Sequence, residues 1–125
     1  MAIAIGALLI VHGLIHLMWF VPPPDDPRYP FTWESPRAEQ NLGWEPDRVR
    51  SLGKALVVAA TVGFVLAGVG ALGVPGLAGS WHALAAASAF ISFAVISLFW
   101  HRYFVVGLAL DIVVVVAGSL GWPAL

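Results

Sequence analysis

The 125-residue chain contains no cysteine, and only 10% of its residues are charged. The lack of cysteine excludes disulfides, thiolate metal sites, cysteine nucleophiles and cysteine-held iron–sulfur clusters. The charged fraction lies far below the roughly 25% typical of soluble domains, whereas 60% of the residues are hydrophobic. A formal net charge of −1 gives no reason to expect a nucleic-acid partner. This composition indicates a single domain whose solvent is the lipid bilayer.

Four apolar stretches are long enough to cross a membrane, because a helix needs about 20 apolar residues to span about 30 Å of hydrocarbon. They cover residues 1–21, 55–74, 81–100 and 103–122. The first stretch has no basic n-region and ends in prolines rather than at a small-residue cleavage site, so we interpret it as a retained span. The last three are joined by short connections, which favour antiparallel neighbours. The sequence therefore predicts an all-α, integral membrane four-helix up-down bundle.

Nearly all the charge lies in the loop 22–51 between the first two spans. All six basic residues fall on the same predicted side of the membrane: Arg28, Arg37, Arg48, Arg50, Lys54 and Arg102. Because loops rich in lysine and arginine stay in the cytoplasm, we predict a cytoplasmic loop with both termini outside. Within this loop, residues 36–42 are predicted to form a short interfacial helix, with Trp33 and Trp44 at the headgroups. Glu45-Pro46-Asp47 is typical of a helix start leading into the second span.

Tryptophans fall at or near the ends of the predicted spans, at positions 19, 81, 100 and 122. An indole ring is apolar but carries an N–H group that favours the hydrated interface, so this placement predicts an aromatic belt.

Two histidines, His12 and His16, interrupt the first span. Four residues on a helix correspond to about 40° of rotation and about 6 Å of rise, so both imidazoles point to one side. Asp111 is the one acid within an apolar run of another span, and the span midpoints place it at the depth of His12. His16 and then His101 lie progressively closer to the loop. The four residues therefore predict a stepwise series of titratable groups from the cytoplasm to the midplane.

Several interpretations of this polar centre remain open. A His12–Asp111 hydrogen bond could simply pin the first and last spans together. The same pair could hold a proton or bind a small ligand such as a quinone carbonyl. His12 and His16 could instead chelate a divalent metal ion, with Asp111 as a third ligand. Haem ligated by two histidines is disfavoured, because no two histidines from different spans share a depth.

Small residues mark the predicted helix contacts. A ridge with a spacing of four runs along the second span, and two glycines share the face of Asp111: Ala59, Gly63, Ala67 and Ala71, then Gly107 and Gly118. Such residues let helix backbones approach closely. The ridge and the loop also support a rival hypothesis, a non-catalytic accessory or scaffold subunit of a larger membrane complex or homo-oligomer. A metal-dependent membrane enzyme is a third hypothesis.

HGLIHLMWF near the start and FWHRYFVVGLALDIVVV near the end carry a resemblance to a known group. Together with the small-residue second span, they resemble short bacterial four-span membrane proteins of uncharacterised function, similar in layout to DoxX-like membrane proteins. This resemblance implies a bacterial inner-membrane protein with a loose association with membrane redox chemistry. The longer, proline-rich loop departs from that group, and the resemblance assigns no catalytic residue.

Overall fold

Four long helices form most of the chain that the structure describes, as the sequence predicted. The computed structural model describes residues 1–35 and 37–125, so the predicted start of the interfacial helix at Pro36 lies outside the described residues. The main helices are α1 (Ala2–Ile15), α2 (Pro46–Ala71), α3 (Trp81–Leu98) and α4 (Val105–Ser119). The tighter segment η1 (His16–Phe20) extends α1, and η3 (Arg102–Phe104) leads into α4. With these extensions, each of the four helical segments is long and apolar enough to cross a membrane.

Helix α2 begins at Pro46, as the Glu45-Pro46-Asp47 pattern predicted. Glu45 is extended, and proline fits the first helical position because its missing N–H would have no partner there. At about 1.5 Å per residue, the 26 residues of α2 extend about 39 Å, which exceeds the about 30 Å of membrane hydrocarbon. The charged first turns of α2 therefore extend beyond the apolar layer on the loop side.

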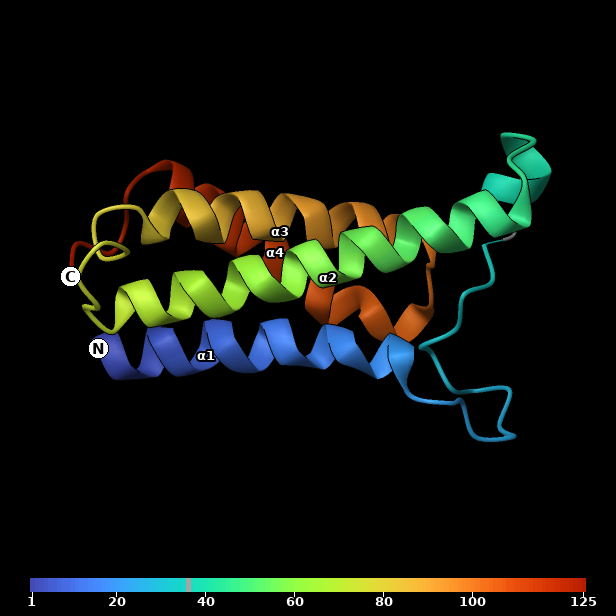
Figure 1. Ribbon diagram of the computed structural model, residues 1–125, viewed down its shortest axis with the longest axis horizontal. Helices are drawn as coiled ribbons and strands as arrows, with labels where there is room; N and C mark the ends of the chain where they lie inside the picture. Colours follow the sequence, from blue (N-terminus) through green and yellow to red (C-terminus); the bar gives the residue numbers. More distant parts are fainter. Residues whose placement is uncertain (36) are drawn as a thin grey trace.

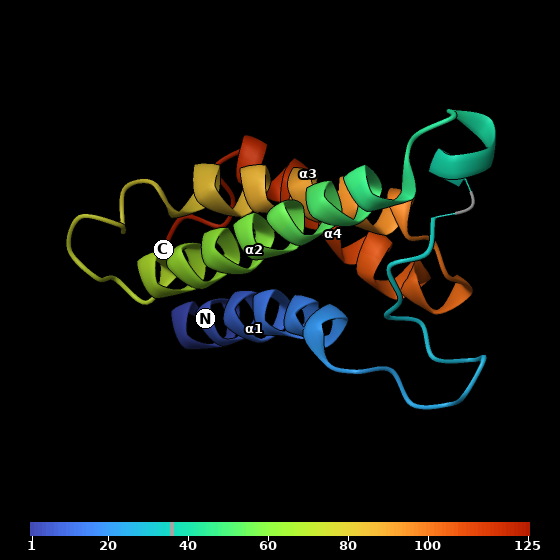
Figure 2. The same cartoon turned by 45° about the vertical axis from the view of Figure 1, so that its right-hand side comes forward.

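The helices pack in sequence order, and both termini lie at the end of the bundle opposite the long loop (Figure 1). α1 packs along α2, α2 along α3, and α3 along α4, whereas α1 and α4 do not pack along their lengths. In the turned view α1 lies below α2, and α4 runs partly behind α2 and α3 (Figure 2). The bundle therefore has a seam between α1 and α4 that helix packing does not close.

Glycines bring neighbouring helices together at the packed interfaces. A Cβ atom built at Gly68 of α2 would lie 2.7 Å from the carbonyl oxygen of Gly6 in α1. Gly63, on the predicted ridge, lies directly against the Ser88 side chain of α3. Ala67 and Ala71 are buried in the core, and only Ala59 of the ridge is exposed. The ridge therefore serves mainly to pack the bundle internally.

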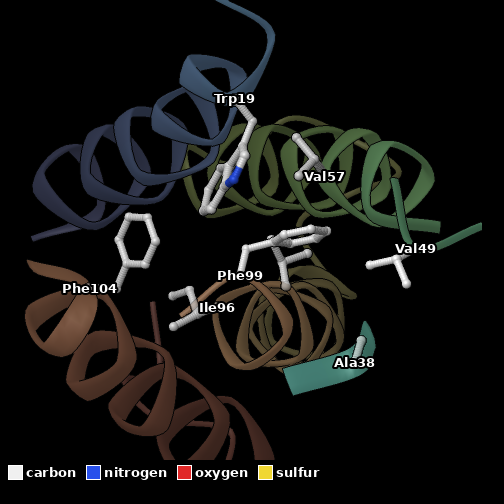
Figure 3. Close-up of a cluster of buried hydrophobic side chains, with 8 residues drawn as sticks. Trp19, Ala38, Val49, Val57, Ile96, Phe99 and Phe104 are labelled. Carbon is white, nitrogen blue, oxygen red and sulfur yellow. The ribbon is translucent and has the colours of Figure 1, made fainter. Parts of the chain in front are cut away.

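An aromatic cluster fills the loop end of the bundle (Figure 3). Trp19 and Phe104 converge there from η1 and η3, with ring centroids 5.1 Å apart. Phe31 folds back from the loop and packs edge-on against Trp19 at 4.9 Å. Ser35 anchors the same loop by donating a hydrogen bond to the Leu98 carbonyl oxygen at 2.5 Å. The loop thus covers one end of the helices.

The tryptophans do not all form a belt. Trp19 and Trp81 are buried within the protein, whereas Trp100 and Trp122 are exposed at the ends of the bundle. For the first two, packing against neighbouring aromatic and apolar groups outweighs placement at the interface. Trp33 likewise packs against Phe99, with ring centroids 5.4 Å apart.

The predicted interfacial helix is reduced to one turn, η2 (Arg37–Asn41). Its Ala38 is fully buried in the aromatic cluster, so this turn packs on the protein. Elsewhere in the loop, Arg28 donates two side-chain hydrogen bonds to the exposed Asp26 carboxylate. These bonds lower the pKa of Asp26 below its ordinary value.

Candidate functional site

A buried hydrogen bond joins α1 to α4 across the open seam. The Nε2 atom of His12 lies 2.9 Å from Oδ1 of Asp111, and the Asp111 side chain is fully buried. The two residues therefore share a depth, as the sequence predicted, and they face each other. The His12 ring is also packed edge-on against Phe64 at 4.7 Å between centroids. The imidazole is thus held from two sides.

Ser92 of α3 extends this contact into a network. Its hydroxyl oxygen lies 2.6 Å from Oδ2 of Asp111 and 2.8 Å from Nε2 of His16, both within hydrogen-bond distance. The Nδ1 atom of His16 lies 3.0 Å from the backbone carbonyl oxygen of His12. Four polar groups from three helices therefore form one continuous chain of hydrogen bonds: His12, Asp111, Ser92 and His16.

Elementary donor counting restricts the protons in this network. A carbonyl oxygen can only accept, so Nδ1 of His16 carries a proton. The Ser92 hydroxyl has one proton for two contacts, one with His16 and one with Asp111. If the hydroxyl donates to an Asp111 carboxylate, Nε2 of His16 must donate to the hydroxyl oxygen. His16 then carries protons on both ring nitrogens and is an imidazolium. If the hydroxyl donates to His16, Asp111 must be protonated at Oδ2.

Both arrangements give the network zero net charge when His12 is neutral. The first pairs the His16 cation with the Asp111 anion, and the second leaves both groups neutral. A net charge at this depth would be expensive, because hydrocarbon solvates ions poorly. The two arrangements interconvert when protons shift along Nε2 of His16, the Ser92 hydroxyl and Oδ2 of Asp111. The geometry is therefore suited to holding a proton without burying a net charge.

Asp111 also fixes the tautomer of His12. Its Oδ1 atom is an acceptor in both arrangements, so Nε2 of neutral His12 carries the proton and Nδ1 keeps a lone pair. Within residues 1–35 and 37–125, this Nδ1 atom has no hydrogen-bond partner, and it is not completely enclosed by protein atoms. Nδ1 therefore keeps an unused lone pair, and Asp111 sets the orientation of its ring.

A cavity of about 270 Å³ lies in the seam beside the two histidines. His12 and His16 line its polar side, and the aromatic side chains of Trp19, Phe31 and Phe104 line its loop end. Further residues from α1, α3, η3 and α4 complete the wall: Ile15, Ile96, Tyr103, Val106, Gly107 and Leu110. The site is thus an apolar cavity with histidine side chains on one wall.

His101 lies apart from this network. Its Nδ1 atom accepts a hydrogen bond from the Tyr103 backbone N–H at 3.2 Å and caps η3. Across the described part of the chain, no hydrogen bond links His101 to His16 or to Asp111. The proposed stepwise series therefore has no continuous hydrogen-bonded path from His101, and the buried Phe104 ring packs against the His101 ring at 6.1 Å.

The Nε2 atoms that would bind a metal ion already form hydrogen bonds in this network. Nε2 of His12 bonds to Asp111 and Nε2 of His16 bonds to Ser92. Within residues 1–35 and 37–125, no group of three or more His, Cys, Asp or Glu side chains is arranged to hold a metal ion. A metal at His12, His16 and Asp111 stays a prediction and would require these hydrogen bonds to rearrange.

Sequence reasoning missed Ser92. A serine within a helix commonly bonds back to a carbonyl oxygen of the preceding turn, and Ser88 does so with Leu84 at 2.6 Å. Ser92 lies four residues after Ser88 on the same face of α3, and its side chain instead contacts Asp111 of α4. The spacing of four residues could have indicated Ser92, because it places Ser88 and Ser92 on one face of the helix, directed toward the other helices.

Comparisons of the chain with models of protein families, with curated proteins and with solved structures find no match.

Proposed function

We propose that this membrane protein binds a small, membrane-soluble ring compound of the quinol and quinone class in the cavity between α1 and α4. The observation that carries the proposal is the position of His12. Its imidazole is oriented by the buried Asp111 carboxylate at 2.9 Å, and it lines an otherwise largely apolar cavity. An apolar pocket with few convergent polar groups is the usual form of a small-molecule site.

Nδ1 of His12 would accept a hydrogen bond from a ring hydroxyl of the quinol. Proton transfer along this bond breaks the O–H bond and forms the Nδ1–H bond, while the ring oxygen keeps the electron pair. The resulting imidazolium is stabilised by Asp111, in the way that a carboxylate stabilises the base of a catalytic triad. The proposal is confined to binding and this proton transfer. A place within a larger redox assembly is compatible with it.

The seam gives the ligand a route from the membrane. α1 and α4 do not pack along their lengths, and Ile15 and Val106 of the cavity wall are 47% and 74% exposed. A lipid-soluble molecule can therefore enter sideways without crossing a polar surface. The volume of about 270 Å³ is close to the lower end of ligand pockets, about 300 Å³, and suits one substituted ring with its tail left in lipid.

The alternative of a scaffold subunit receives less support from the structure. The small-residue ridge that would dock a partner is largely used inside the bundle, where Gly63 contacts Ser88 and Ala67 is fully buried. The resemblance to DoxX-like membrane proteins stays a prediction, and it agrees with a quinone-related role. We also propose the bacterial inner membrane as the location.

A titration with a short-chain benzoquinol, and separately with its quinone, tests the proposal on protein in mild detergent. Trp19 lines the cavity, so binding should quench part of the tryptophan fluorescence in a saturable manner. Gly107→Leu should fill the cavity and weaken binding at least tenfold. Gly107→Ala is the matched control, because a Cβ there meets only Ile96 Cδ1 at an ordinary 3.4 Å. Equal binding by the wild type and Gly107→Leu would overturn the proposal.

A further inference from the structure

A second, larger groove lies at the loop end of the bundle and shares Trp19 and Phe31 with the cavity proposed to hold the quinol. Its volume is about 490 Å³. Aromatic side chains from η1 and the loop form one part of its lining, and two basic residues of α2, Arg50 and Lys54, form another. Both basic residues are exposed and lie one helical turn apart, so their charged groups reach the same side of α2.

Trp33 packs against α2 close to these two cations and lines the same groove. Gly53 lies between them in the sequence, and a Cβ atom built there would lie 3.0 Å from Cζ3 of Trp33. The Trp33 ring also packs against Phe20 at 5.6 Å and against Phe99 at 5.4 Å. A rigid aromatic floor is thus placed beside the basic pair. Phe20 itself is 46% exposed and continues this floor toward the lipid.

The basic pair has no carboxylate partner within the described residues. The ion pairs found there join Arg28 to Asp26, Arg48 to Glu45 and His12 to Asp111. Arg50 and Lys54 fall where α2 passes from the loop side into its apolar stretch, which is the depth of lipid headgroups. Two cations without an ion-pair partner, in one groove with the exposed Phe20 ring, are complementary to an anionic headgroup joined to acyl chains.

We propose that this groove binds the phosphate headgroup of an anionic phospholipid from the loop-side leaflet. Arg50 and Lys54 would contact the phosphate oxygens, and the acyl chains would follow Phe20 along the bundle. Glu34 also lines the groove and would oppose the anion. Removing the Glu34 charge should therefore strengthen lipid binding, whereas removing either cation should weaken it.

Native mass spectrometry of the full chain in mild detergent can compare phosphatidylglycerol with phosphatidylcholine of the same acyl chains. The wild type should bind phosphatidylglycerol more tightly. Arg50→Gln and Lys54→Gln should each weaken that binding about fivefold, and the double variant about 25-fold, because each cation near an anionic surface contributes about that factor. Glu34→Gln should strengthen it. All three positions are exposed, so the variants should fold.

Arg48→Gln is the matched control, because Arg48 is paired with Glu45 at 3.3 Å and does not line the groove. It should leave the preference unchanged. An equal loss in Arg48→Gln and Arg50→Gln, which remove the same charge, would reduce the effect to net charge and overturn the site. Binding of soluble glycerol phosphate as tightly as the lipid would overturn the assignment to a membrane lipid. Absence of any preference for phosphatidylglycerol in the wild type would overturn the whole proposal.

Discussion

The imidazole of His12 and the carboxylate of Asp111 meet at 2.9 Å across a seam where their helices do not otherwise pack. A polar contact therefore supplies the connection between α1 and α4 that packing supplies between the other neighbouring helices. His12 also lines the cavity, so the buried Asp111 side chain sets the orientation of an imidazole on the cavity wall.

The energetic coupling of this pair can be measured by a double-mutant cycle. His12→Ala, Asp111→Asn and the double variant should give a favourable coupling of about 0.6 to 1.7 kcal/mol, the range of side-chain hydrogen bonds within membranes. Reversible unfolding in mixed detergent provides the free energies. Additive effects of the two changes would show that the observed contact does not join the helices.

Ser92→Ala should change the protonation of His16 without unfolding the protein. The variant removes the hydroxyl that joins His16 to Asp111, so Nε2 of His16 loses its partner. Nitrogen-15 NMR of labelled histidines should show this change at His16. Ser88→Ala is the control on the same helix, since its hydroxyl bonds to the Leu84 carbonyl. An unchanged His16 spectrum in Ser92→Ala would contradict the network.

Two glycines of α4 should respond differently to the same substitution. A Cβ atom at Gly118 would lie 2.8 Å from the His82 carbonyl oxygen, so Gly118→Ala forces backbone apart and should cost about 1 to 3 kcal/mol. Gly107→Ala meets only an ordinary contact and should be neutral, or stabilising by up to about 1 kcal/mol through helix propensity. Thermal melts in detergent compare them. A Gly118→Ala variant as stable as Gly107→Ala would contradict the close α3–α4 approach.

Both termini share one end of the bundle, so a single reporter can test the orientation. The basic residues near the loop predict a cytoplasmic loop and an external C-terminus. A periplasmic reporter such as alkaline phosphatase, fused after Leu125, should therefore be active. Activity of a cytoplasmic reporter at that position instead would reverse the orientation, while leaving the helical arrangement intact.

The four helices and the shared depth of His12 and Asp111 could be predicted from the apolar runs of the sequence, whereas the direct contact between the two side chains required the structure. Apolar length defined the spans, and equal depth matched the histidine to the acid. Ser92 could not be assigned in the same way, because a serine in an Ala/Ser-rich helix is compatible with bonding back to its own helix or across to another. The aromatic lining was also hidden, because Phe31 and Trp33 reach the bundle through an irregular loop with no periodic pattern. Trp19 was expected in the aromatic belt because the sequence gives its depth along the span. Its burial inside the bundle depends on the neighbouring helices and cannot be read from that depth.

The most direct test is to purify the protein from its native membrane in mild detergent and analyse what accompanies it, by organic extraction, optical spectroscopy and element analysis. We predict a quinone in near-equal amount to the protein, absent from the cavity-filled Gly107→Leu variant purified in parallel. A stoichiometric metal or a Soret band would instead contradict the assigned ligand class. A blank extract, together with no response to added benzoquinol, would contradict a ligand site and leave His12 and Asp111 with a structural role.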